Sequence, residues 1–229
     1  MENISSSRPA RSLGSTRDYT YKTLKNKILN LELGPATKIS EKDISEQLKV
    51  SRTPVREAFL KLSQEELLEI YPQSGTFVSK ISLSQVEEAR FVRENLEKAV
   101  VREACDVLTE EGLFQLETNL KMQEMCAEKN NVSQLFELDE QFHQVLYLSC
   151  GKRRTWNMVQ QMASHFNRLR MLRLAVILNW EVIISQHKQI VEYIKTKDKD
   201  NVEKVISEHL KLVIAEKGEL ERNYPNYFN

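Results

Sequence analysis

The 229-residue sequence has few of the features that cross-link a chain or hold it in a membrane. It has three cysteines, an odd number, which argues against a disulfide framework. They are far apart in the sequence and do not form a metal-binding motif, so a cysteine-bound metal is not predicted either. No apolar run approaches the roughly 18–20 residues that a membrane-spanning helix needs, and the N-terminus lacks an apolar signal core. These absences favour a protein of the reducing cytoplasm that has no membrane partner.

Neither sign of charge dominates the chain, because 33 Lys and Arg residues balance 33 Asp and Glu residues. Residues 1–80 carry thirteen basic and ten acidic side chains, whereas the remainder is slightly acidic. A mildly basic front part is compatible with phosphate contact, and an acidic remainder argues against a second nucleic-acid surface.

The most informative segment reads VSRTPVREAFLKL and lies in the N-terminal third of the chain. Pro54 is tolerated in the first turn of a helix, which Ser51 or Thr53 can cap. Arg52 and Arg56 lie four residues apart and therefore share one face near the positive end of the helix dipole. The apolar residues occupy a different face. A helix that enters a nucleic-acid groove with its N-terminus first needs this division.

The flanking segments complete a small domain. Residues 21–31 repeat apolar side chains at a helical period, and Ser40 with the acids that follow it opens a second helix. Residues 68–71 and 76–81 are two β-prone runs, joined by the turn sequence PQSG. Three helices followed by a hairpin predict a winged helix-turn-helix in which the hairpin is the wing.

Residues 20–81 resemble the DNA-binding domain of GntR-type bacterial transcription regulators, through VSRTPVREA and the wing sequence GTFV. The resemblance implies binding to double-stranded operator DNA. The DNA contacts that it implies are Lys42, Ser51, Arg52, Thr53, Arg56 and Gly75. Two residues depart from the family pattern near the wing, since Glu66 stands where glycine is usual and Gln73 where a basic residue is common.

The rest of the chain predicts an all-α bundle. Proline is absent from residues 82–221, and Leu, Glu, Lys and Gln dominate the composition. The expected helices cover residues 84–107, 110–129, 132–149, 152–175, 180–197 and 200–221. The predicted fold is therefore mainly α. Its predicted parts are a disordered polar arm at 1–17, a winged helix-turn-helix at 18–81, and an all-α effector-binding and dimerisation domain at 82–229.

Three of the four histidines are placed as metal ligands would be. His187 and His209 each fall inside the apolar stripe of a predicted helix, and the turn expected at residues 197–199 lies midway between them. Asp139 and His143 lie one helical turn apart beside a third apolar stripe. A single histidine on an apolar face is more often a hydrogen-bonded core residue. The register of two histidines and the added Asp/His pair instead predict a divalent metal site.

Residues 84–215 resemble the FCD domain of the FadR branch of the GntR regulators. That domain has an Asp-x-x-x-His pair and two later histidines about 22 residues apart, and all four positions are filled here. The resemblance implies a divalent ion, with zinc favoured and nickel or manganese as alternatives. It also implies a small organic acid that completes the coordination of the ion. Six helices favour the shorter VanR-type variant over the seven-helix FadR type.

Two further polar residues interrupt apolar stripes. Arg93 lies inside the stripe of helix 84–107, where a carboxylate effector would provide a bidentate partner. The alternative is an internal ion pair between Arg93 and Glu97, one turn later. Arg173 is a weaker effector candidate, and His165 is expected at most to line the cavity.

We therefore expect a homodimeric transcription regulator, a repressor, that binds a palindromic operator and a small organic acid. An enzyme that uses the Asp/His centre with an open coordination position is one alternative, and a regulator with a purely structural metal is another. No general base stands at a motif spacing, and a free-standing enzyme has no use for a DNA-reading domain. The expectation is consequently that the protein is not an enzyme.

Overall fold

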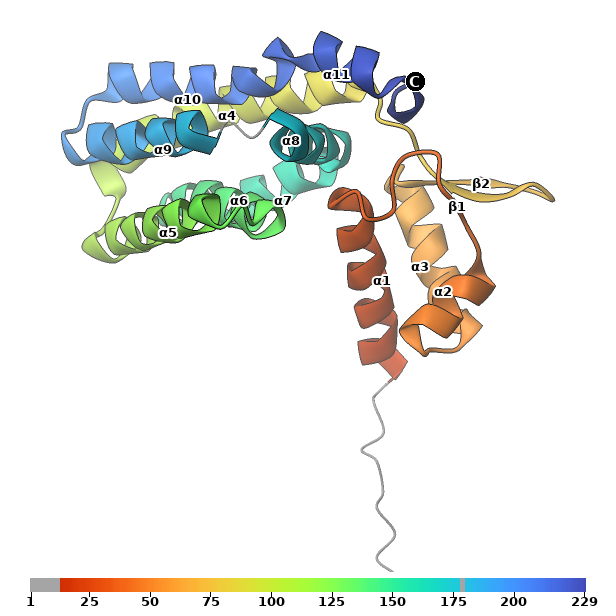
Figure 1. Cartoon of the computed structure of the whole chain (residues 1–229). Coiled ribbons are helices and arrows are strands. Elements are labelled where there is room, and N and C mark those ends of the chain that lie inside the picture. Colours follow the sequence, from red (N-terminus) through yellow and green to blue (C-terminus); the bar gives the residue numbers. More distant parts are fainter. Residues whose placement is uncertain (1–12, 178–179) are drawn as a thin grey trace, which may run out of the picture. The chain divides into compact units, whose positions relative to one another are not determined.

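The computed structural model describes residues 13–177 and 180–229, which divide into two compact units (Figure 1). Unit 1 contains the described residues up to Ile28 together with residues 32–79, and unit 2 contains residues 29–31 and 80–229. Most of the arm expected at 1–17 lies outside the described residues. The described part of the chain begins with a helix that runs from Leu13 to Leu29.

Unit 1 consists of three helices and a small antiparallel sheet. The helices are α1 (Leu13–Leu29), α2 (Glu41–Leu48) and α3 (Arg52–Gln64), and the strands are β1 (Lys38–Ile39), β2 (Leu68–Tyr71) and β3 (Gly75–Val78), in the order β1-β3-β2. The Ser40 side chain caps α2 by accepting a hydrogen bond from the Asp43 N–H. Ser51 precedes α3 in an extended conformation but makes no side-chain cap bond. The winged helix-turn-helix is present, and β1 adds a strand that was not predicted.

The wing and the turn that precedes it contain three residues in the left-handed backbone region. Gly75 has φ +121°, and a Cβ atom there would lie 2.7 Å from Cε of Lys38, so this position requires glycine. Glu66 and Gln73, the two departures from the family pattern, have φ values of 58° and 65°. At Glu66 the backbone thus adopts a conformation that glycine takes without a steric cost, which fits the glycine that the resemblance implies at this position.

Unit 2 is helical. Its helices are α4 (Leu83–Val107), α5 (Glu110–Glu128), α6 (Val132–Ser149), α7 (Arg153–Met162), α8 (Ser164–Ile177), α9 (Trp180–Lys195), α10 (Lys199–Ala215), α11 (Lys217–Asn223) and the short 3-10 helix η1 (Pro225–Tyr227). The helix expected at 152–175 is two helices that meet at Ala163, and the one expected at 200–221 breaks at Glu216. The first break has a physical reason. α7 buries only one face, whereas residues 163–174 are all buried, so the chain turns at Ala163 to enter the core.

The helices of unit 2 enclose a core with a polar centre. α4 packs along α10, α5 packs along α6, and α9 contacts α4, α5 and α10 (Figure 1). The apolar core includes Phe142, Phe166 and Ile190. Buried arginine, histidine and acidic side chains lie among these apolar groups on α4, α6, α8, α9 and α10. No helix in the described part of the chain is both long enough and apolar enough to cross a membrane.

The segment that enters α4 is held by two other parts of unit 2. The N–H of Ile81 donates to the carbonyl of Tyr227 at 2.7 Å, and Ile81 forms a parallel bridge with Phe228. The next N–H, that of Ser82, donates to Nδ1 of His165 at 3.0 Å. The first residues of unit 2 are therefore fixed both by its C-terminal segment and by the start of α8.

Candidate metal centre and nucleic-acid interface

Three helices bring one carboxylate and three imidazoles together inside unit 2. Asp139 and His143 project from α6, His187 from α9 and His209 from α10. All four side chains are buried, and one ligand atom from each lies within 4.8 Å of the others. The predicted convergence of these residues is therefore present. The antiparallel pair of α9 and α10 places the two later histidines at the same level, as their spacing indicated.

The three Nε2 atoms surround the Asp139 carboxylate. They lie 3.7 Å from it for His143, 3.7 Å for His187 and 4.0 Å for His209. The Nε2 atoms of His143 and His209 are 3.2 Å apart. Three imidazole nitrogens and one carboxylate oxygen form a donor set that suits zinc and related divalent ions.

The second ring nitrogen of each histidine faces an oxygen acceptor. Nδ1 of His143 lies 2.7 Å from a carboxylate oxygen of Glu97, and Nδ1 of His209 lies 3.2 Å from Oε1 of Gln186. Nδ1 of His187 lies 2.9 Å from Oε1 of Gln123. Such outer contacts orient metal-binding imidazoles and select their tautomers.

The tautomer of His187 follows from a chain of hydrogen bonds. The Asn119 amide donates to the carbonyl of Leu138, and the Gln123 amide donates to Oδ1 of Asn119. Oε1 of Gln123 therefore faces His187, whose Nδ1 must be the donor. Its Nε2 then carries a lone pair toward the cluster and has no hydrogen-bond partner among the described residues. A cation would satisfy this buried atom.

For Asp139, His187 and His209, the surroundings favour the protonation states that metal binding needs. Burial lowers the pKa of His187 to about 3, against the attraction of Asp139. Burial, with His187 and His143 as neighbours, also lowers the pKa of His209 well below its usual value. Burial alone would raise the pKa of Asp139, but Arg170 and the neighbouring histidines outweigh it and hold that pKa below its ordinary value.

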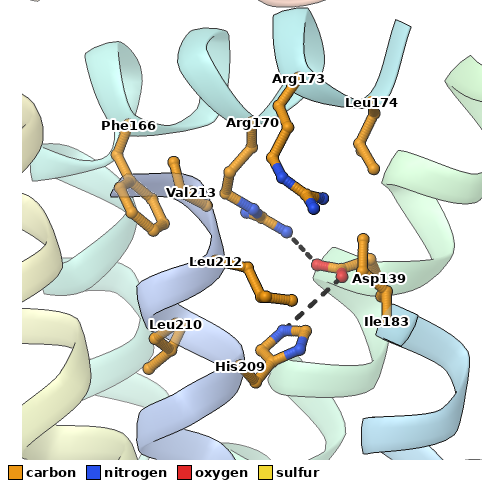
Figure 2. Close-up of a pocket in the computed structure, with 10 residues that line it drawn as sticks. All are labelled: Asp139, Phe166, Arg170, Arg173, Leu174, Ile183, His209, Leu210, Leu212 and Val213. Carbon is orange, nitrogen blue, oxygen red and sulfur yellow. Dashed lines mark hydrogen bonds and ion pairs between the residues drawn. The ribbon is translucent and has the colours of Figure 1, made fainter. Parts of the chain in front are cut away.

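A small cavity of about 20 Å³ adjoins the cluster, with room for about one water molecule. Figure 2 shows Arg170 and Arg173 reaching into it from α8, opposite Asp139 and His209. Arg170 forms an ion pair with Asp139. Nε of Arg173 donates to Glu216 at 2.5 Å. Two cationic side chains therefore border the site where an anion would meet the metal.

Arg93, the predicted effector ligand, is paired internally. It donates to Glu97 at 2.6 Å and to Glu140 at 3.0 Å, and it does not line the cavity. The alternative ion pair with Glu97 is therefore the arrangement present, and an effector role for Arg93 stays a prediction. Glu140 also pairs with Arg170, so one carboxylate joins the two arginines. Sequence reasoning missed Arg170, although three arginines in the run RLRMLR of a buried helix were a usable signal.

His165 lies apart from the cluster. Its Nδ1 accepts a hydrogen bond from the Ser82 backbone, and it belongs neither to the metal-binding group nor to the cavity lining. Its role in this structure is to connect α8 with the N-terminal end of α4.

The residues expected to contact DNA lie on α2, at the N-terminal end of α3 and in the wing of unit 1. All are exposed except Gly75, which is half-buried; the exposed ones are Lys42, Ser51, Arg52, Thr53 and Arg56. Nε and Nη2 of Arg56 donate to the two carboxylate oxygens of Glu41, each at 3.0 Å.

Comparison with known proteins identifies the family. Residues 16–78 match the family described as bacterial regulatory proteins, gntR family, and residues 88–212 match the FCD domain. The HTH-type transcriptional repressor RspR of Escherichia coli (strain K12) is 33% identical over 209 residues, which cover 91% of this chain and 92% of the relative. The chain belongs to the GntR family of bacterial transcriptional regulators.

Solved structures of GntR regulators share the fold. McbR/YncC of E. coli has a TM-score of 0.78 at 24% identity and covers 92% of this chain and 99% of its own. A GntR regulator from Rhodococcus sp. RHA1 has a TM-score of 0.76 at 18% identity, with the same coverage. The mainly α fold of this GntR regulator, with its small wing sheet and helical C-terminal part, is thus the family fold.

Proposed function

We propose that this GntR regulator is a cytoplasmic, homodimeric repressor of a palindromic operator, controlled by a small carboxylate that binds at a metal centre in unit 2. The observation that carries the proposal is the cavity between the Asp/His cluster and two arginines of α8. The relative RspR is named as a transcriptional repressor, which supports repression rather than activation. The two units would serve as the DNA-reading domain and the effector and dimerisation domain.

The metal would be held by Asp139, His143, His187 and His209, with zinc preferred and nickel or manganese as alternatives. A bound ion supplies a coordination position that attracts a carboxylate oxygen. The chain itself supplies the second half of the recognition. Arg170 and Arg173 face the same cavity, and a guanidinium binds a carboxylate through two parallel hydrogen bonds.

The size of the cavity links effector binding to the breaking of existing ion pairs. It holds about one water molecule as it stands, so a carboxylate must displace side chains to enter. Arg173 is bound to Glu216 and Arg170 to Asp139. An entering anion would compete with Glu216 for Arg173, while a metal would compete with Arg170 for Asp139.

The residues whose contacts would be displaced are connected to the segment that joins the two units. Glu216 lies where α10 meets α11, and the chain after α11 pairs with Ile81. From the other end of α8, His165 holds Ser82. Release of Glu216 or a shift of α8 would therefore change how residues 81–82 are held. We propose that this is how effector and operator binding become thermodynamically coupled.

A thermal-shift screen of small mono-, di- and tricarboxylates tests the proposal on zinc-loaded and chelator-treated full-length protein. We expect a stabilising carboxylate with the zinc-loaded protein only, and a loss of its effect in Arg173→Gln. Arg154→Gln, which changes an exposed arginine of α7, is the matched control. Equal stabilisation of loaded and chelated protein would contradict a metal-anchored effector. Zinc binding without any carboxylate effect would favour the purely structural metal.

A further inference from the structure

The ion pair between Arg56 and Glu41 has an unusual location for a DNA-reading surface. Arg56 is one of the two arginines of α3 that are predicted to read bases, and Glu41 is the first residue of α2. Both carboxylate oxygens of Glu41 accept bonds, from Nε and from Nη2, each at 3.0 Å. An acid is favourable at a helix N-terminus, but that preference requires no pairing with Arg56. Close to DNA phosphates, the negative charge of Glu41 makes the free energy of DNA binding less favourable.

The two hydrogen bonds occupy one edge of the guanidinium and leave another open. Arginine has five N–H donors in a planar fork. Glu41 takes the edge formed by Nε and Nη2, so the outer edge formed by Nη1 and the second Nη2 hydrogen remains available. Guanine presents O6 and N7 in the major groove to such a pair of donors. The contact with Glu41 thus holds the side chain while leaving its base-reading edge free.

Arg52 provides the contrast within the same helix. It is exposed, and across the described part of the chain no carboxylate is paired with it. An arginine side chain loses conformational entropy when it is fixed at a base, and a preformed contact reduces that loss. Arg56 is therefore preorganised whereas Arg52 stays adaptable, and the two arginines should not contribute alike to sequence discrimination.

We propose that Glu41 is a specificity-determining residue, which fixes Arg56 for a single guanine and whose charge weakens binding to unrelated DNA. This rests on the proposed DNA-reading role of α3. Glu41 acts through Arg56 and is a positioning residue. The opposite reading makes Glu41 an inhibitor of Arg56 that DNA must displace, and it predicts tighter operator binding when the carboxylate is removed.

The test begins with selection of preferred duplexes from a random library by the full-length protein. Affinities are then measured at one salt concentration for the selected duplex, for each of its single base-pair variants and for an unrelated duplex of equal length. We expect Glu41→Gln to weaken binding to the selected duplex, to strengthen binding to the unrelated one, and to lower the ratio of the two affinities about tenfold. The penalty for changing one G·C pair should shrink in Glu41→Gln and in Arg56→Ala, with no further loss in the double variant.

Two variants separate positioning from charge. Glu46→Gln removes a charge from an exposed position of the same helix and should leave the affinity ratio unchanged. Glu41→Asp keeps the charge but shortens the reach, so it should lose discrimination at that base pair while still disfavouring the unrelated duplex. The proposal is overturned if Glu41→Gln behaves like Glu46→Gln, or if it tightens binding to the selected duplex. Wild-type affinity and discrimination in Arg56→Ala would instead refute the role of α3 itself.

Discussion

The residues of the candidate metal centre differ in the hydrogen bonds that surround them. His187 is fixed by a chain of two amides that ends at the Leu138 carbonyl, next to Asp139 in the sequence. Asp139, a proposed metal ligand, is therefore adjacent in sequence to the residue whose carbonyl ends this series of hydrogen bonds. These hydrogen bonds connect α9, α5 and α6, and they begin at Nδ1 of His187. Loss of such an outer contact typically lowers metal affinity about 10–100-fold.

We expect the purified protein to carry about one divalent ion per subunit, because four buried donor side chains converge. Elemental analysis after purification without chelators measures the ion. His187→Ala and His209→Ala should each lose most of it. His165→Ala, which alters the histidine outside the cluster, should keep it. Full metal content in the first two variants would place the ion elsewhere.

For the outer contacts, Gln123→Leu should weaken zinc binding by about 10–100-fold, because His187 loses the acceptor that fixes its tautomer. Competition with a chromophoric chelator measures the affinity. Gln115→Leu removes an exposed glutamine from the same helix and should bind zinc as the parent protein does. Unchanged affinity in Gln123→Leu would show that the contact is incidental.

At the DNA surface, Arg52→Ala and Arg56→Ala should each weaken operator binding by about 1–3 kcal/mol, provided that each arginine reads a base through two hydrogen bonds. The fold and the oligomeric state should not change, since both side chains are exposed. Titrations at matched salt, with Arg154→Ala as the control, measure the effect. Parent-level affinity in both variants would remove α3 from the reading surface.

At the level of helices, sequence periodicity predicted the features that follow from a helical repeat. It missed the features that depend on tertiary contacts. The equal spacing of His187 and His209 from the turn between their helices predicted that the two side chains lie side by side. The break at Ala163 did not, because neither glycine nor proline marks it and only the burial of α8 explains it. Arg170 was missed although the run RLRMLR was a signal. The run indicates arginines in a buried helix, but it does not show which carboxylate on another helix each arginine faces.

The contact between α4 and α10 includes a buried acid with a testable pH effect. Burial alone would raise the pKa of Glu94, but hydrogen bonds from Ser207 and Lys98 lower it from 4.5 to about 2. A carboxylate with a depressed pKa in the folded state stabilises the fold above its unfolded pKa. That stabilisation is lost as the pH falls through the folded value. The relevant window is therefore between pH 4.5 and about 2.

Glu94→Gln should accordingly lower the free energy of unfolding by about 1–3 kcal/mol at neutral pH, and the difference from the parent protein should vanish near pH 2. Urea unfolding at a series of pH values measures this difference. Glu88→Gln, an exposed change on the same helix, should shift stability little at any pH. A Glu94→Gln deficit that persists undiminished at the lowest pH would show that the carboxylate's charge is not responsible.

At the level of the whole molecule, the candidate metal centre and α3, the proposed reading helix, belong to different compact units. We therefore expect His209→Ala to leave operator affinity unchanged without effector and to abolish the effector response, because a carboxylate loses its anchor with the ion. Operator titrations with and without the carboxylate found by thermal shift, in parent and variant, measure the response. An equal response in both proteins would exclude the metal from sensing.

The closure of unit 2 on itself has a consequence for protein engineering. The Asn229 N–H lies 3.4 Å from the Ile81 carbonyl, and Ile81 in turn donates to Tyr227. The first and last segments of the bundle are therefore hydrogen-bonded to each other. Chains with adjacent ends tolerate circular permutation and insertion into loops of unrelated hosts. Unit 2 could therefore be grafted into a fluorescent or enzymatic host to test whether it reports binding of the proposed ion and of the proposed organic acid.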